Sequence, residues 1–332
     1  MTEGAQRSVK RAVGVLVLLS VPFIVRGTYA LHVVNQVGIF CLLALGLNLV
    51  VGFAGQLSVG QAGFYGIGAY TSAILATRYG VPFWLALPAA GCLTGLVGAL
   101  IGPILRLRGV FLAMATLAFG EIVRIVISNW VPVTNGPNGI SGIPFPALGG
   151  FPLATDGRYY YLILAWVLLC YGCIGRMIDS RIGRAMNAIR DNQDAAEIMG
   201  VHVARYKMMA FAVAAFFAGV AGSLFAHLQT FISPDQFTFI TSVDIIFMVV
   251  VGGLGSIPGS LIGAAVVVIA PEFLRFFKYY RLIVYSLVIL FILIFAPRGL
   301  YGAVARLKTL AVGGWGSARK LAAHGSRPRA ST

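Results

Sequence analysis

The stretch that decides the fold is Gly27–Thr77, GTYALHVVNQVGIFCLLALGLNLVVGFAGQLSVGQAGFYGIGAYTSAILAT, whose 51 residues include no Lys, Arg, Asp or Glu. A membrane-spanning helix needs about 20 predominantly apolar residues. This stretch is therefore too long for one span and long enough for two. We expect the helix to break in the Gly-rich run GFAGQLSVGQAG, Gly52–Gly63, because glycine favours irregular backbone.

The composition of the whole chain agrees with a membrane protein. Of its 332 residues, 59% are hydrophobic and only 11% are charged, whereas soluble domains have about 25% charged residues. A water-soluble globular fold is excluded. The net charge of +15 does not indicate a nucleic-acid-binding protein, because most of the chain lacks the polar surface such proteins use. We predict an all-α, polytopic integral membrane protein.

Other gaps between charged residues mark the remaining spans, because a charge at mid-bilayer is costly. The gaps are Ala12–Val25, Tyr79–Leu105, Ile125–Thr155, Tyr159–Gly175, Met208–Pro234, Ile245–Pro271 and Leu282–Pro297. Val110–Val131 reads as a further span in which Glu121 and Arg124 pair at i, i+3. The total is about eight spans plus Gly-interrupted half-helices. The first run also fits a cleavable secretory signal, but we expect it to remain as the first helix.

Basic residues predict the orientation, since Lys and Arg are retained on the cytoplasmic side. The connection 131–157 has none and is expected outside, whereas the connection 176–207 has six and is expected in the cytoplasm. If Thr241–Leu274 crosses once, the basic residues divide 14 inside to 10 outside; if it is a hairpin turning at VGGLGSIPG, they divide 18 to 6. We therefore prefer the hairpin.

This scheme divides the chain into three parts, with both termini in the cytoplasm. Residues 1–11 form a cytoplasmic segment, residues 12–300 the transmembrane permease domain, and residues 301–332 a basic cytoplasmic tail.

Two Gly-interrupted segments in the two halves of the chain indicate a transport pathway, because unwound backbone offers N–H and C=O groups to a polar solute. Close helix packing is the alternative, since several of these glycines are spaced four apart. The candidate pathway residues are Gly55, Gln56, Ser58 and Gln61 in the first segment and Gly252, Gly253, Gly255 and Ser256 in the second.

The cytoplasmic connection contains GRAMNAIRDNQDAAEIMGVHVARYK, in which a short helix is predicted at Asn192–Met199. Asp191 and Asp194 resemble a capping box at its start, and Gly200 is a stop signal. Ala195, Ile198 and Met199 would fall on one face, at i, i+3 and i+4. Such a face suits docking into a groove of another protein, although a solvated turn has the same spacing.

The sequence indicates no metal, redox or ATP site. Cys170 and Cys173 form a C-x-x-C without the second pair that a zinc site needs. No Gly-Lys pair exists, so the usual phosphate-binding loop is missing. We expect no cofactor and no enzymatic activity, and an energy source in another subunit. A proton-coupled carrier or a channel acting alone is the alternative, although the one acidic residue well within a span, Glu121, has Arg124 beside it.

The chain resembles the LivM-type membrane subunits of branched-chain amino acid ABC importers. The resemblance lies in GLNLVVGFAGQLSVGQAGFYGIGAYTSAIL, TLAFGEIVRIV with TNGPNGISGIP, IRDNQDAAEIMGV, and VVVGGLGSIPGSLIGA, in one unbroken order from about Leu31 to Leu300.

The resemblance implies a multi-pass protein of a bacterial inner membrane that forms the pathway with a LivH-type second permease. It also implies two ATP-binding cassette subunits and a periplasmic amino-acid-binding protein as partners. The implied substrates are leucine, isoleucine and valine, with urea or short amides as the alternative within the wider family. The implied ATPase-coupling residues are Arg190, Asp191, Asp194, Ala195, Ala196, Glu197 and Gly200.

Overall fold

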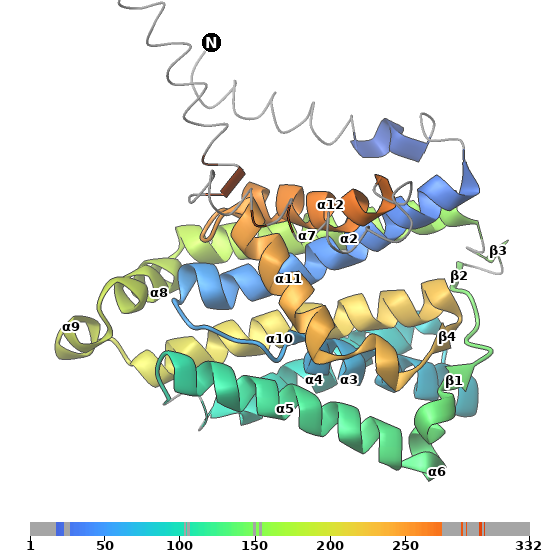
Figure 1. Cartoon of the computed structure of the whole chain (residues 1–332), viewed down its shortest axis with the longest axis horizontal. Helices are drawn as coiled ribbons and strands as arrows, with labels where there is room; N and C mark the ends of the chain where they lie inside the picture. The colour runs from blue at the N-terminus through green and yellow to red at the C-terminus, as the bar shows by residue number, and fades with distance from the viewer. Residues whose placement is uncertain are drawn as a thin grey trace, which may run out of the picture.

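The computed structural model describes residues 18–22, 27–102, 104, 107–148, 151–152, 155–273, 287, 290, 299, 300 and 302. Most of the predicted first span, Ala12–Val25, and nearly all of the predicted last span, Leu282–Pro297, lie outside these residues. Within them the chain is almost entirely helical (Figure 1). The long helices are α2 (Thr28–Asn48), α3 (Gln61–Arg78), α4 (Phe83–Leu100), α5 (Val110–Asn129), α7 (Asp156–Asp179), α10 (Val203–Gln229), α11 (Phe239–Gly252) and α12 (Ile257–Phe273).

Short elements connect them. They are the π-helical turn η1 (Leu49–Phe53), α6 (Val131–Thr134), η3 (Gly136–Asn138), β1 (Ile140–Ser141), β2 (Ala147–Leu148), β3 (Phe151–Pro152), α8 (Arg181–Asp191), α9 (Gln193–Ile198), β4 (Phe231–Ile232) and η4 (Pro234–Gln236). The strands form two antiparallel pairs, β1 with β4 and β2 with β3. These pairs lie at one end of the bundle, and α8 and α9 lie at the other (Figure 1).

Six helical segments in the described part of the chain are long and apolar enough to cross a membrane. They are Thr28–Phe53, Phe83–Leu100, Val110–Asn129, Asp156–Asp179, Val203–Gln229 and Pro234–Gly252. α3 is long enough to cross a membrane, but its many Gly, Ser, Thr and Tyr residues make its mean hydropathy lower than that of these six segments. The predicted break in Gly27–Thr77 is confirmed, because helix ends at Phe53 and resumes at Gln61.

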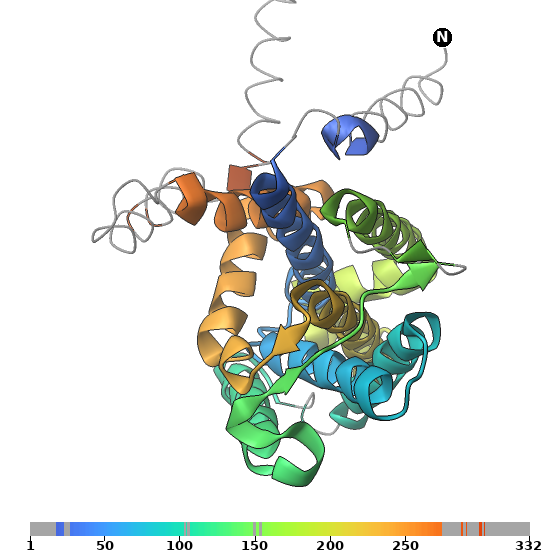
Figure 2. The ribbon, with the colours of Figure 1, turned by 90° about the vertical axis from the view of Figure 1, so that its right-hand side faces the viewer.

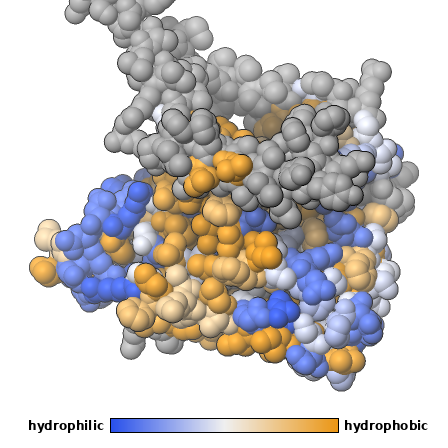
Figure 3. All heavy atoms as spheres, in the orientation of Figure 1, coloured by the Kyte–Doolittle hydropathy of each residue, from blue (hydrophilic) through white to orange (hydrophobic). Residues whose placement is uncertain are grey.

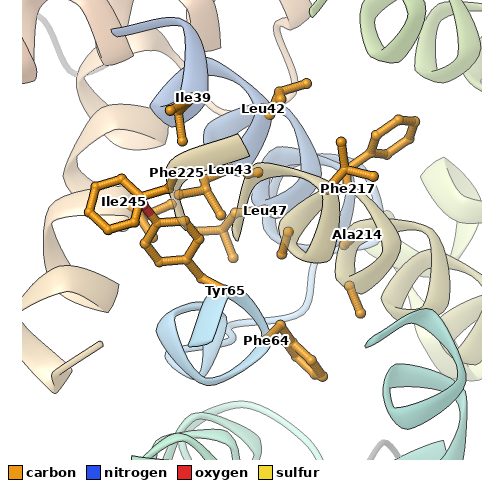
Figure 4. Close-up of a cluster of buried hydrophobic side chains, with 14 of the residues drawn as sticks. Ile39, Leu42, Leu43, Leu47, Phe64, Tyr65, Ala214, Phe217, Phe225 and Ile245 are labelled. Carbon is orange, nitrogen blue, oxygen red and sulfur yellow. The ribbon is translucent and has the colours of Figure 1, made fainter. Parts of the chain in front are cut away.

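α2 and α10 form the centre of the bundle, and the other helices surround them (Figure 2). In each of these two segments 72% of the most apolar window is buried, against 22% for α5. Their side chains meet those of α3 and α11 in one continuous core (Figure 4). Burial of such side chains stabilises by about 1.5–3 kcal/mol each in an aqueous reference, whereas inside a membrane close packing itself holds the helices together.

Glycine allows the closest approach in this core, between α3 and α10. A methyl group on Gly68 would overlap the backbone of Gly219, and one on Gly222 would overlap that of Tyr65. The packing interpretation of small residues therefore holds for these glycines.

A buried histidine fastens the Pro- and Gly-rich connection 131–157 to the bundle. His227, near the end of α10, is fully buried. Its Nδ1 lies 2.7 Å from the carbonyl oxygen of Pro144, and its Nε2 lies 3.0 Å from Oγ of Ser72, which also contacts Ser223. Because each ring nitrogen has a partner, burial leaves neither of them unsatisfied.

Candidate transport pathway and coupling site

The two Gly-interrupted segments, about 200 residues apart in the sequence, lie against each other. Gly52 in η1 faces the turn between α11 and α12, and a Cβ atom on Gly52 would lie 2.5 Å from the amide nitrogen of Gly255. No larger residue fits this approach without displacing the backbone. The structure therefore joins the two stretches that the sequence singled out separately.

Asn48 at the end of α2 holds this junction together. Its Nδ2 donates to the carbonyl oxygen of Ser256 at 3.0 Å and to Oγ of Ser260 at 2.7 Å, while its Oδ1 accepts from the amide of Gly255 at 2.9 Å. Asn48 is 1% exposed. The sequence analysis missed Asn48 and Ser260, although an asparagine inside an apolar run is the same signal that drew attention to Gln56.

Gln56, Ser58 and Gln61 are buried in the irregular segment and at the start of α3. Both polar side-chain atoms of Gln56, Oγ of Ser58 and Nε2 of Gln61 have no hydrogen-bond partner among the described residues. A buried unsatisfied polar group costs about 1–3 kcal/mol. Such groups need an explanation.

The candidate residues of the second segment shape a helical hairpin. Gly252 of α11 packs on Gly259 of α12, and Gly253 and Gly255 have φ of 117° and 75°. The hairpin turns at residues 253–256, as predicted. Oγ of Ser256 accepts from the amide of Gly259 at 3.1 Å, so its hydroxyl is used within the first turn of α12.

Two helices form the connection 176–207, where the sequence predicted one. α8 begins after Ser180, whose Oγ accepts from the amide of Ile182. α9 begins after Asn192, whose Oδ1 accepts from the amide of Ala195 at 3.1 Å. The prediction that Asp191 starts this helix was wrong, because Asp191 is the last residue of α8 and Asn is an equally good cap. Gly200, with φ of 83°, follows the helix as expected.

The predicted apolar face, formed by Ala195, Ile198 and Met199, is exposed. Ala195 is exposed, and Ile198 and Met199 are 86% and 83% exposed. Ala196, in contrast, is buried with Ile189 and Val203 in a small cluster of the connection itself. It supports the fold of the connection, and it is not part of the exposed face.

Polar contacts tie α9 to the rest of the protein. Asp194 pairs with Arg108 at 2.9 Å, across an exposed contact to the segment before α5. Gln193 accepts from Nζ of Lys207 at 2.9 Å. Glu197 is exposed. Exposed ion pairs contribute about 0–1 kcal/mol, so these contacts orient the loop more than they stabilise it.

Arg190, at the end of α8, reaches the junction of the Gly-interrupted segments. Its Nη1 donates to the carbonyl oxygen of Gly52 at 2.6 Å. A Cβ atom on Gly255 would lie 2.8 Å from the same nitrogen, and one on Gly55, with φ of 66°, would touch the aliphatic part of the side chain. One side chain thus connects the α8–α9 loop with both segments.

Comparisons with known proteins agree with this architecture. Residues 29–297 match the family described as branched-chain amino acid transport system / permease component. The chain is 40% identical over 304 residues to the high-affinity branched-chain amino acid transport system permease protein LivM of Escherichia coli, covering 84% of this chain and 71% of that protein.

Other relatives are more distant. The ribose import permease protein RbsC of Haemophilus influenzae is 28% identical, over 78% of this chain and 82% of that protein. The permease protein LivH of Salmonella typhimurium is 23% identical, over 79% of this chain and 91% of that protein. No solved structure matches the chain. The match over most of its length, together with the helical bundle and its Gly-interrupted junction, shows that this chain belongs to the branched-chain amino acid transport system permease family.

Proposed function

We propose that this protein is one permease subunit of an ATP-driven importer of branched-chain amino acids in a bacterial inner membrane. It forms the pathway with a LivH-type second permease and works with two ATP-binding cassette subunits and a periplasmic amino-acid-binding protein. The names of the relatives support the substrate class. The single observation that carries the mechanism is the contact of Arg190 with the junction of the two Gly-interrupted segments.

In this proposal α9 is the element that docks on an ATPase subunit. Its exposed face is small and apolar, since Ile198 and Met199 are both largely exposed. The end of the molecule at which α9 lies is mostly hydrophilic (Figure 3). Apolar side chains at that degree of exposure suit a groove of a partner protein. The six basic residues of the connection 176–207 support a cytoplasmic position for this end, where ATP is available.

Transport then proceeds by alternating exposure of the junction to the two sides. Docking motion at α9 passes through α8 to Arg190 and from there to Gly52 and the turn at Gly255. The buried polar groups of Gln56, Ser58 and Gln61 gain hydrogen-bond partners when this region opens to a polar solute.

The Ala195→Arg variant tests the docking role. Ala195 is exposed, so the substitution leaves the fold and insertion intact, while a bulky charge facing an apolar groove opposes docking at a cost of several kcal/mol. We expect loss of co-purification with the ATPase subunits and at least a tenfold loss of ATP-driven leucine uptake. Uptake of urea in place of leucine by the unchanged complex would contradict the substrate assignment.

The exposed Asn187 of α8 provides a matched control, since Asn187→Arg adds the same charge outside the α9 face. Ala196→Arg is unsuitable, because Ala196 is buried and its replacement disturbs the connection itself. Full uptake and normal co-purification by Ala195→Arg would refute the docking role of α9.

A further inference from the structure

An ion pair lies on an exposed side of α5, near the middle of a helix long enough to cross a membrane. Nε of Arg124 donates to Oε1 of Glu121 at 3.0 Å, and the two side chains are 30% and 39% exposed. The rest of that helix surface is apolar. It includes Phe111, Met114, Leu117, Ile122, Ile125 and Val126, all exposed.

Contact with lipid does not explain this position. Charged side chains in spanning helices are costly toward hydrocarbon and face a bundle interior or a water-filled cavity. A hydrophilic spot interrupts the hydrophobic surface in the region of α5 and the start of α11 (Figure 3). A second subunit or a water-filled pathway over this part of α5 satisfies that requirement.

A pocket beside Glu121 joins α5 to the Gly-rich segment. Val59, Ala62 and Gly120 line it together with Phe237, Phe239 and Ser242 of the η4–α11 region. The amide of Ala62, in the first turn of α3, donates to Oγ of Ser242 at 3.0 Å. The first turn of α3 thus borders the pocket. The positive end of its helix dipole favours the negatively charged form of the Glu121 side chain, which also lines the pocket.

We propose that Glu121 and Arg124 bind the two charged groups of an amino acid zwitterion during its passage. Glu121 accepts from the ammonium group, and the planar guanidinium of Arg124 donates to the carboxylate. One ion pair is exchanged for two, so the net charge of the site stays at zero and no charge is left unpaired. The apolar side chain of the amino acid packs on the exposed Leu117 and Phe239.

This inference rests on the proposed function, from which it takes the substrate, and it adds where and how that substrate is held. It also explains why an acidic residue lies within a span without any need for proton coupling. The carboxylate of Glu121 pairs with Arg124 in the absence of substrate and with the ammonium group of the substrate when it is bound.

The test uses the whole importer in vesicles, with the four native cysteines replaced by alanine and Leu117→Cys introduced at the pocket. A small water-soluble thiol reagent should label Leu117→Cys, and millimolar leucine should slow labelling at least threefold. Isoamylamine, which has the same apolar group and the ammonium but no carboxylate, should not slow it. In the double variant Glu121→Gln/Arg124→Gln, which keeps size and hydrogen bonding, the protection by leucine should vanish and leucine uptake should fall at least tenfold.

Two outcomes separate this inference from the proposed function. If the unchanged importer transports leucine and the double variant transports it equally well, the zwitterion site is wrong and the importer stands. If the unchanged importer does not transport leucine, the proposed function itself fails. Absence of labelling at Leu117→Cys, with labelling at Asn187→Cys, which is exposed outside the α9 face, would show that this side of α5 is closed to water and would overturn the inference.

Discussion

Replacement of Arg190 by alanine should uncouple ATP hydrolysis from transport without detaching the ATPase. Arg190 is the side chain through which the α8–α9 loop contacts the junction, by its hydrogen bond of 2.6 Å to Gly52. Its removal takes away that bond and the packing of its aliphatic part on Gly55. The exposed face of α9 is unchanged by this substitution, so docking should continue.

The size of the effect follows from that one contact. A hydrogen bond from a charged donor contributes about 1.5–3 kcal/mol. Because Arg190 is exposed overall and water competes for its guanidinium, we take the lower end, about 1.5 kcal/mol. This corresponds to about a tenfold change in an equilibrium. Leucine uptake should fall about tenfold, and the ATP hydrolysed per leucine imported should rise by a similar factor. Arg190→Lys, which keeps one charged donor, should lie in between.

The assay is ATP-driven leucine uptake in vesicles, measured together with ATP hydrolysis and with co-purification of the ATPase subunits. Arg184→Ala is the matched control. Arg184 is exposed on the same helix, and its side chain makes no hydrogen bond or ion pair with the part of the chain that the structure describes. Normal uptake by Arg190→Ala, or an equal loss in both variants with co-purification intact, would refute the transmission role of Arg190.

Two further substitutions test the packing that supports the pathway. Gly68→Ala places a methyl group into the backbone of Gly219 and should destabilise the protein by about 1–3 kcal/mol, seen as a lower unfolding temperature in detergent. Gly172→Ala, inside α7 with open space around it, should not lower that temperature, because alanine is the better helix former. His227→Phe removes the contact of the imidazole with Pro144 and should cost about 1–3 kcal/mol through unsatisfied buried groups. Limited proteolysis of the connection 131–157 reads out the second change, and an unaltered cleavage rate would mean that His227 does not hold that connection.

Local rules were sufficient for much of the fold. Charge gaps located α2, α3, α4, α7 and α10, because a charge at mid-bilayer is costly wherever it lies in the sequence. The gap Ile125–Thr155, in contrast, holds the end of α5 and short elements instead of another span. The break after Phe53 and the turn before Ser256 followed from clustered glycine, which adopts φ above zero at little cost. The stop at Gly200 has the same origin. α8 escaped prediction, because its many charges carry no span signal and its capping residue, Ser180, precedes it without an apolar run.

The sequence by itself thus determined a helical membrane protein with two interrupted segments and a short helix in a basic connection. Only the tertiary structure decided that Asn48 binds the turn at Gly255, that Arg190 reaches Gly52, and that Ala196 is buried while its neighbour Ala195 is exposed. Each of these depends on which helix faces are packed together. A local pattern reports the cost of placing a residue in water or lipid, whereas contacts between residues of different helices are decided by how those helices pack.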